Sequence, residues 1–305
     1  LICYPHFPSR KAMKYFLSFI RHKFVSFFEM CTLHFLVSLL VLHTRNVIGL
    51  AAICKVEGKV LNCSAIHLTN IPRDLTIPSG VYTIDFSYNN VTNISVLDFN
   101  KTAYQNITML LFHHNNISQI EYHSFSQLQN IVSLDLSHNN LQGSMVSGYL
   151  FTNLSKLQAL FLNHNPIKAI EPQAFTLLQM PALQMINLSH CEIESIGSAA
   201  FDFSTLTYLD LSWNSIPHTF PDSFYIDGYF GTWDLSHNNL TKIDKLPIFE
   251  DIRNIILDYN YINRLTLRYV LPLFANTFKT VSVRYNRLTS VTNFSLPQDI
   301  EKVDY

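Results

Sequence analysis

The stretch SLDLSHNNL, residues 133–141, decides the fold because near copies of it recur along the chain. TYLDLSWNSI occupies residues 207–216, and TWDLSHNNL occupies residues 232–240. Successive units begin 22 to 26 residues apart, and repeats of this length are typical of solenoids. The nine full units begin at Val81, Ile107, Ile131, Leu157, Leu183, Leu206, Phe230, Ile252 and Phe278, and a truncated tenth begins at Ile300.

Each unit follows the pattern L-x-x-L-x-L-x-x-N-x-L, in which the two residues of L-x-L share one face of a short strand. One such strand cannot bury its face alone, whereas stacked neighbours about 4.8 Å apart share a continuous core. The pattern therefore predicts a parallel sheet with one strand per unit. In five units a phenylalanine follows 18 residues after the start: Phe99, Phe125, Phe175, Phe201 and Phe224.

This pattern resembles the leucine-rich repeat family over residues 54–305. The stretch CKVEGKVLNCSAIHLTNIPRDL, residues 54–75, is similar to the family's cysteine-bearing N-terminal cap. LDLSHNNL and AFTLLQMPALQMINLS look most like extracellular receptors of the Toll and Toll-like kind, and they also resemble secreted matrix proteins. The resemblance implies an α/β solenoid, a leucine-rich repeat horseshoe with a parallel β-sheet on its concave face. It also implies a protein-binding receptor ectodomain or, alternatively, a secreted adhesive or structural matrix protein.

Four segments are expected along the chain. Residues 1–29 are an uncertain leader or untranslated sequence, and residues 30–52 read as a signal peptide, because the apolar run 35–42 is too short to span a bilayer. An uncleaved membrane anchor is the alternative for this segment. Residues 53–80 form the cysteine-bearing cap and residues 81–305 form the repeats. The last residues begin a repeat, so we expect the natural protein to continue and a membrane anchor is possible beyond residue 305.

The cysteines fit a secreted protein. Of five, Cys3 and Cys31 lie before residue 53, and the secreted context predicts a disulfide between Cys54 and Cys63. Cys191 is left single, and it stands where the other units place an asparagine whose buried amide can bond the backbone of the turn. We expect a structural thiol there rather than a reactive one. The expected ladder comprises Asn89, Asn115, Asn139, Asn165, Cys191, Asn214, Asn238, Asn260 and Asn286.

Composition and motifs favour a binding protein over an enzyme. Hydrophobic residues make up 48% of the chain, so it can bury a core. The part after residue 52 holds 15 Lys+Arg against 21 Asp+Glu, a formal charge of −6, which makes nucleic acid an unlikely partner. The sequence carries no nucleophile-elbow, zincin, P-loop, dinucleotide-binding or C-x-x-C motif, so no catalysis, cofactor or metal site is expected. A protein or glycoconjugate ligand is expected instead.

Acceptor motifs for N-glycosylation, N-x-S/T, support an extracellular location. Several chance matches are expected among them, because Asn and Ser belong to the repeat itself. The ten candidates are Asn62, Asn90, Asn93, Asn100, Asn106, Asn116, Asn153, Asn187, Asn239 and Asn293.

The concave face is where a solenoid of this kind is expected to bind its ligand. Its central column is predicted to contain Asp85, Leu111, Asp135, Phe161, Asn187, Asp210, Asp234, Ile256, Ser282 and Asp304. The aspartates form either a solvated acidic face or a calcium site. The candidate apolar contacts, which alternatively are scattered surface residues, are Met109, Leu111, Phe161 and Met185. The candidate contacts for an anionic partner, which alternatively form a solvated edge, are Arg253, Lys279 and Arg284.

The position before the ladder asparagine holds a ring in all nine full units. These residues are Tyr88, His114, His138, His164, His190, Trp213, His237, Tyr259 and Tyr285. They are expected to form one column, with bases roughly 5 Å apart, that covers the strand ends. A second hypothesis makes the run His114, His138, His164 and His190 a pH switch, because acid charges histidine below a pKa of about 6.5. In that hypothesis like charges repel, whereas Asp135 favours the charged forms.

Overall fold

The computed structural model describes residues 54–99, 102–146, 148–176, 178–243, 249–266, 280–292 and 302–304. The chain divides into two compact units, Leu1–Ala52 and Ile53–Tyr305. The expected leader and signal peptide lie outside the described residues, and only the second unit is considered below.

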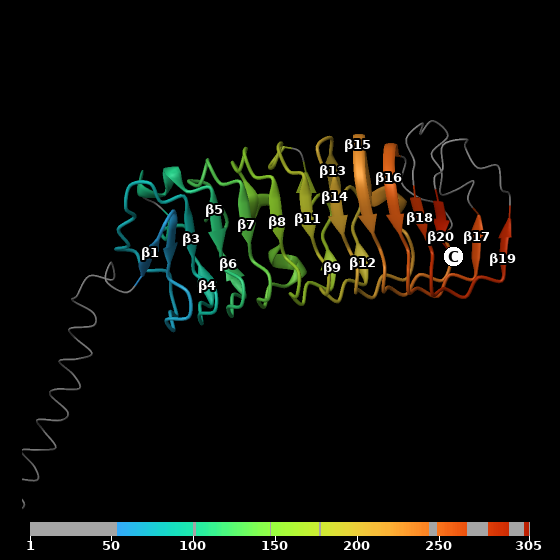
Figure 1. Cartoon of the computed structure of the whole chain (residues 1–305), viewed down its shortest axis with the longest axis horizontal. Helices are drawn as coiled ribbons and strands as arrows, with labels where there is room; N and C mark the ends of the chain where they lie inside the picture. The colour runs from blue at the N-terminus through green and yellow to red at the C-terminus, as the bar shows by residue number, and fades with distance from the viewer. Residues whose placement is uncertain are drawn as a thin grey trace, which may run out of the picture. The chain divides into compact units, whose positions relative to one another are not determined.

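One main sheet of 14 strands runs through the second unit, and successive repeats each contribute a strand to it, most of them three residues long (Figure 1). Twelve strands follow one another along the sheet: β1 (Lys55–Glu57), β2 (Val60–Asn62), β3 (Thr83–Asp85), β5 (Met109–Leu111), β7 (Ser133–Asp135), β8 (Ala159–Phe161), β11 (Met185–Asn187), β14 (Tyr208–Asp210), β15 (Phe224–Asp234), β16 (Phe249–Ile256), β18 (Thr280–Ser282) and β20 (Lys302–Asp304). β1 pairs antiparallel with β2, and each later pair along this path is parallel.

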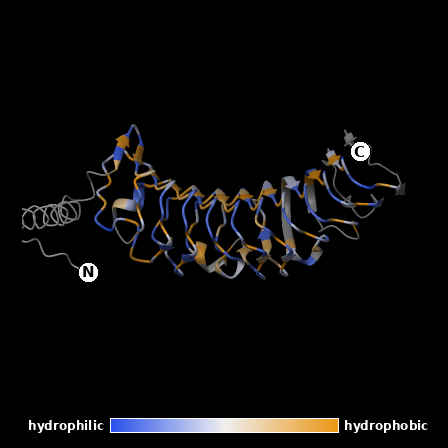
Figure 2. Cartoon of the chain, turned by 90° about the horizontal axis from the view of Figure 1, so that it is seen from below, coloured by the Kyte–Doolittle hydropathy of each residue, from blue (hydrophilic) through white to orange (hydrophobic). Residues whose placement is uncertain are grey.

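The middle residue of each repeat strand enters the core, as the L-x-x-L-x-L pattern requires. Ile84, Leu110, Leu134 and Leu160 are fully buried, while the residues on either side of them are half-buried or exposed. Figure 2 shows this sheet along the concave side of the unit, with a hydrophobic residue recurring at each strand. The parallel sheet that the repeat predicted is therefore confirmed.

The opposite side of the coils holds smaller elements. β10 (Phe175–Thr176) pairs with β13 (Phe201–Phe203), which joins the long strand β15. Three further pairs are β4 (Asn93–Ile94) with β6 (Gln119–Ile120), β9 (Ala169–Ile170) with β12 (Ser195–Ile196), and β17 (Arg264–Thr266) with β19 (Ser290–Thr292). Within the described ranges the helical segments are short 3₁₀ turns: η2 (Thr102–Asn106), η3 (Gly143–Met145), η4 (Gly148–Phe151) and η5 (Pro221–Ser223). The α part of the expected α/β solenoid is thus reduced to such turns.

A column of stacked phenylalanines fills the core behind the sheet. It contains the five residues expected from the sequence and also Phe151, whose ring lies 6.5 Å from that of Phe125 and 6.4 Å from that of Phe175. Phe151 stands 20 residues after the start of its unit instead of 18. The turns η3 and η4 absorb the two extra residues, so the ring keeps its place in the column.

The disulfide between Cys54 and Cys63 is present and joins the two strands of the N-terminal hairpin, with both cysteines buried. The prediction made from the secreted context is therefore confirmed. β1 follows Cys54 directly and Cys63 follows β2, so the bond closes the open end of the antiparallel hairpin, whose strand β2 pairs with β3 of the first parallel coil.

Candidate ligand-binding surface

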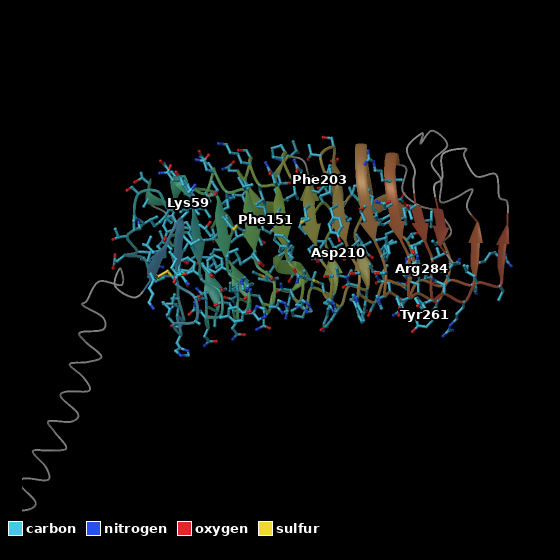
Figure 3. All side chains as sticks on the ribbon, viewed as in Figure 1. Lys59, Phe151, Phe203, Asp210, Tyr261 and Arg284 are labelled. Carbon is cyan, nitrogen blue, oxygen red and sulfur yellow. A yellow bond between two sulfur atoms is a disulfide. The ribbon has the colours of Figure 1, made fainter. Side chains whose placement is uncertain are left out.

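The central column of the concave face is arranged as the repeat predicts. Strand register places Asp85 beside Leu111, Leu111 beside Asp135, and so on through Asp234 to Ile256, Ser282 and Asp304. Asp210 lies on these strands in Figure 3. We call seven facing residues the acid–apolar row: Asp85, Leu111, Asp135, Phe161, Asn187, Asp210 and Asp234.

Serines hold the polar members of this row in fixed turns. The backbone N–H of Ser137 donates to Asp135 Oδ1 at 2.9 Å, and the Ser137 hydroxyl donates to the same oxygen at 2.6 Å. Ser212 binds Asp210 in the same two ways, and the N–H groups of Ser87 and Ser236 reach Asp85 and Asp234. The recurring D-x-S of the sequence therefore forms an Asx turn at the end of each strand that ends in aspartate at Asp85, Asp135, Asp210 or Asp234.

An asparagine supports the same turn. Ser189 donates to Asn187 Oδ1 from its N–H at 2.9 Å and from its hydroxyl at 2.8 Å. In the cap, Asn62 lies beside Asp85 in the sheet and accepts hydrogen bonds from Ser64 in the same way. Sequence reasoning did not place Asn62 in this column, although its N-x-S spacing carried the signal.

The four apolar candidates do not form one patch. Met109 and Leu111 belong to β5, whereas Phe161 and Met185 belong to the adjacent strands β8 and β11. β7, with Asp135, lies between the two groups. Met109 is 38% exposed and the other three are half-buried, so the concave face presents two small apolar groups separated by a carboxylate.

The ladder asparagines lie just beyond the strands and tie each coil to the preceding one. Asn139 Nδ2 donates to the carbonyls of Leu136 in its own coil and Phe112 in the preceding coil, and Oδ1 accepts the N–H of Ile117. Asn89, Asn115, Asn165, Asn214, Asn238, Asn260 and Asn286 make corresponding pairs of bonds. These bonds satisfy buried backbone groups that would otherwise have no partner.

Cys191 occupies a ladder position but makes only the donor half of the hydrogen bonds that an asparagine makes there. Its thiol donates to the carbonyls of Leu162 and Ser189, but it has no amide oxygen to accept an N–H from the preceding coil. The N–H of Ile167 bonds to Asn165 O instead, and Lys168 adopts a φ of 61°. Burial raises the pKa of the Cys191 thiol to about 12, which disfavours the reactive thiolate.

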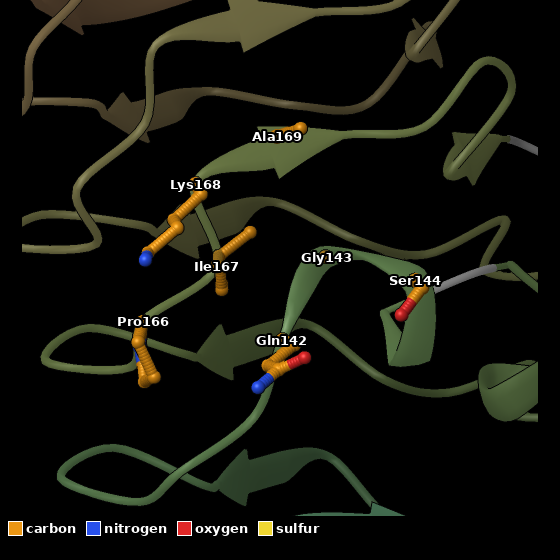
Figure 4. Close-up of a pocket in the computed structure, with 7 residues that line it drawn as sticks. All are labelled: Gln142, Gly143, Ser144, Pro166, Ile167, Lys168 and Ala169. Carbon is orange, nitrogen blue, oxygen red and sulfur yellow. The ribbon is translucent and has the colours of Figure 1, made fainter.

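A pocket of about 290 Å³ lies beside this altered turn (Figure 4). It is lined by Gln142, Gly143, Ser144, Pro166, Ile167, Lys168 and Ala169. A Cβ on Gly143 would stand 1.9 Å from Ala169 O, so only glycine permits the two coils to approach here. Lys168 pairs with Glu192 at 3.9 Å, and both side chains are mostly exposed.

The nine rings form the expected column. Neighbouring ring centroids are 3.7 to 5.1 Å apart, and their planes differ by 10° to 17°. All nine residues have a φ between 51° and 56°, a left-handed conformation that turns the chain after each strand. Their stacked rings cover this turn, and the sequence alone did not indicate the backbone conformation.

The surroundings of three histidines in the ring column lower their pKa values. The pKa of His138 is lowered by partial burial and then by His164 and His114, and these effects outweigh Asp135, which raises it. The pKa of His164 is lowered by burial, then by His190 and His114, and that of His237 by burial. The expectation that Asp135 would favour charged histidines is therefore outweighed at His138.

The glycosylation candidates occupy different surfaces. Six are exposed: Asn90, Asn93, Asn106, Asn116, Asn153 and Asn239. Asn62 and Asn187 are half-buried on the main sheet, and Asn187 lies between Phe161 and Asp210 on the concave face. Asn100 and Asn293 lie outside the described residues.

Arg253 and Arg284 are exposed, and the backbone N–H of Tyr259 donates to the carbonyl of Arg284, which is labelled among the C-terminal coils in Figure 3. Lys279, which was expected beside Arg253, lies outside the described residues. In the part of the chain that the structure describes, no three His, Cys, Asp or Glu side chains are grouped to hold a metal ion. Nor does any helix in that part combine the length and apolar character needed to cross a bilayer.

Comparison with known proteins identifies the repeat. Family models described as leucine-rich repeats match residues 127–144, 144–193 and 205–225. The chain is 31% identical over 91 residues to human Amphoterin-induced protein 1, covering 30% of this chain and 18% of that protein. It is 33% identical over 84 residues to chicken Tsukushi, covering 27% of this chain and 22% of that protein.

Among solved structures, a chain of the Toll–Spatzle complex of Drosophila is similar in fold. Its TM-score is 0.58 at 19% identity, and the match covers 75% of this chain and 30% of that one. The matches thus span less than a third of each of these three proteins.

Proposed function

We propose that this chain, which contains leucine-rich repeats and is similar in fold to a chain of the Toll–Spatzle complex, is an extracellular protein-binding module. Its role is ligand recognition in a cell-surface or endosomal receptor, without catalysis. The observation that carries the proposal is the concave face, where each coil presents two or three side chains on a rigid strand. Such a surface can contact a large partner with side chains that the core does not use.

Three further features support a secretory origin. The disulfide seals the N-terminal cap, six N-x-S/T asparagines are exposed, and residues 30–52 have the pattern of a signal peptide. We therefore propose cleavage close to Ala52, followed by the cap at residues 53–80 and the repeats at residues 81–305. N-terminal sequencing of protein secreted from eukaryotic cells tests this division.

A glycan placed on the concave face tests the proposed function. Asp135→Asn creates the acceptor Asn-Leu-Ser on β7. The turn with Ser137 is expected to persist, because Asn187 and Ser189 form the same turn in another coil. Asp202→Asn is the matched control, because it creates Asn-Phe-Ser at an exposed position of β13, away from the concave positions of the repeat. Both changes remove one carboxylate and add one glycan.

The experiment measures binding of the secreted repeat unit, fused to a reporter, to intact cells and to deposited extracellular matrix. Binding that is lost with Asp135→Asn and kept with Asp202→Asn supports recognition through the concave face. Binding that survives the concave glycan would show that the partner uses another surface. Binding confined to matrix, with full-length protein absent from membranes, would favour the adhesive alternative.

A further inference from the structure

The acid–apolar row has a charge pattern that selects among partners. Over the strands β3 to β15, the concave positions of the repeat contain four aspartates and no lysine or arginine. Basic residues appear only at the ends of this stretch. Lys59 stands over the Tyr82 ring at 5.5 Å on the N-terminal side, and Arg253 and Arg284 follow on the C-terminal side.

The carboxylates of the row are oriented and still able to accept hydrogen bonds. The Asx turn engages Oδ1 of each aspartate, so an incoming donor has Oδ2 to bind. Asp210 and Asp258 both repel the carboxylate of Asp234. The pKa of Asp234 is raised, first by burial and also by Asp210 and Asp258, even though Ser236 lowers it. An approaching cation relieves this repulsion.

Apolar side chains lie between the carboxylates. Leu111 separates Asp85 from Asp135, and Phe161 separates Asp135 from Asn187. Met185 and Tyr208 face each other on the neighbouring strands β11 and β14. A partner that matches this surface therefore carries both cations and apolar groups, which alternate opposite the strands from Asp85 to Phe161.

We propose that the acid–apolar row docks a basic, amphipathic polypeptide segment. The inference rests on the proposed function and names the class of partner for the same face. Seven strands about 4.8 Å apart span roughly 29 Å, which sets the length of the segment. Lysine or arginine of the segment binds the aspartates, and its apolar side chains cover Leu111, Phe161 and Met185. The basic residues at both ends of the row limit where the segment begins and ends.

Asn187 is the one uncharged polar residue of the row, and the neighbouring coils indicate which substitution would add a carboxylate there. Asn187→Asp gives the same Asp-Leu-Ser as the neighbouring coils, keeps the bonds from Ser189 and removes a glycosylation acceptor. Ser189→Ala removes the same acceptor without adding charge. The two variants together separate the effect of the carboxylate from that of a glycan.

The test uses a short peptide of alternating lysine and leucine as the probe, with binding to the secreted repeat unit measured by surface plasmon resonance. Asp135→Ser, Asp210→Ser and Asp234→Ser are combined, because serine retains a turn of the same kind and creates no glycosylation acceptor. The matched control combines Glu171→Ser, Glu194→Ser and Asp202→Ser, which are exposed and lie outside the concave positions of the repeat. Both triple variants lose the same net charge.

We expect the row variant to bind the peptide about tenfold more weakly, and Asn187→Asp to bind it about 2- to 5-fold more tightly than Ser189→Ala. The control triple variant should keep wild-type affinity. Equal losses in the two triple variants would reduce the effect to net charge and overturn the proposal. So would unchanged binding by the row variant when Asn187→Asp also has no effect.

Failure here is distinguishable from failure of the proposed function. If the concave glycan abolishes binding to cells or matrix while the row variant still binds the lysine–leucine peptide normally, the concave face recognises a partner of another chemistry. In that case the binding module stands and only the basic-segment proposal falls.

Discussion

The asparagine ladder and the acid–apolar row run through the same coils, yet they obey different rules. Eight of the nine ladder positions hold the same residue, because each asparagine bonds the backbone of two coils. The row holds Asp, Leu, Phe and Asn. Its members can vary because the core requires only the residue before each of them on the strand to be apolar and buried. Uniformity therefore marks the positions that hold the solenoid together, and variation marks those free to recognise a partner.

Removing one ladder amide should have the largest effect. Asn139 is 5% exposed, and Asn139→Ala leaves the N–H of Ile117 and the carbonyl of Phe112 without this partner in the core. We expect a loss of about 3 kcal/mol in the free energy of unfolding. Urea denaturation of the secreted repeat unit measures it. Asn140→Ala, one residue later and exposed, should change stability by less than about 0.5 kcal/mol; comparable losses would deny the ladder its role.

Restoring the missing ladder amide should work in the opposite direction. Cys191→Asn supplies an oxygen for the N–H of Ile167, which now bonds within its own turn. We expect a gain of about 1 kcal/mol in the free energy of unfolding by the same denaturation. Cys191→Ala, which loses the thiol bond to Leu162, should instead be destabilising. A destabilised Cys191→Asn protein would show that the coil has adapted to cysteine.

Changing the row should affect stability least among these substitutions. Asp135→Ser replaces an Asx turn with the weaker serine turn and leaves the buried strand residue Leu134 in place. We expect a change below about 1 kcal/mol, measured beside Asn139→Ala under identical conditions. A loss as large as that of Asn139→Ala would mean that the row, too, holds the coils together.

The smallest expected effect is the pH dependence of stability. It concerns the ring column, whose residues lie between the row and the ladder in each repeat. Lowered pKa values of His138, His164 and His237 mean that the folded protein binds protons less readily than the unfolded chain. Stability is thus complete above the ordinary histidine pKa of 6.5 and declines as pH falls below it towards the lowered folded values.

Thermal unfolding between neutral pH and about pH 5 measures this decline. The variant His138→Gln with His164→Gln should show a shallower decline than wild type, whatever its absolute stability. His218→Gln, outside the column, should keep the wild-type slope. Identical slopes in all three proteins would mean that the column serves only as packing. That result would also count against the hypothesis that acid acts on ligand binding through His114, His138, His164 and His190.

Much of the site followed from spacing alone. Residues one repeat apart must lie on adjacent strands, so the sequence predicts the members of the row, the ladder and the ring column. The pattern could not show that Ser137 donates two hydrogen bonds to Asp135, or how exposed each apolar candidate is. Those details depend on hydrogen bonds and packing that the spacing of residues does not specify.

The sequence by itself determined the repeat, the register of the strands and the inward face, because a period of 22 to 26 residues leaves one way to stack L-x-L strands. Only the tertiary structure decided how the irregular coils are accommodated. Phe151 joins its column despite two extra residues, Gly143 meets the next coil where a Cβ would clash, and Lys168 adopts a left-handed backbone in the turn beside Cys191, where no side-chain amide oxygen meets the N–H of Ile167. In each case the cause is contact between neighbouring coils, which a pattern within one repeat does not contain.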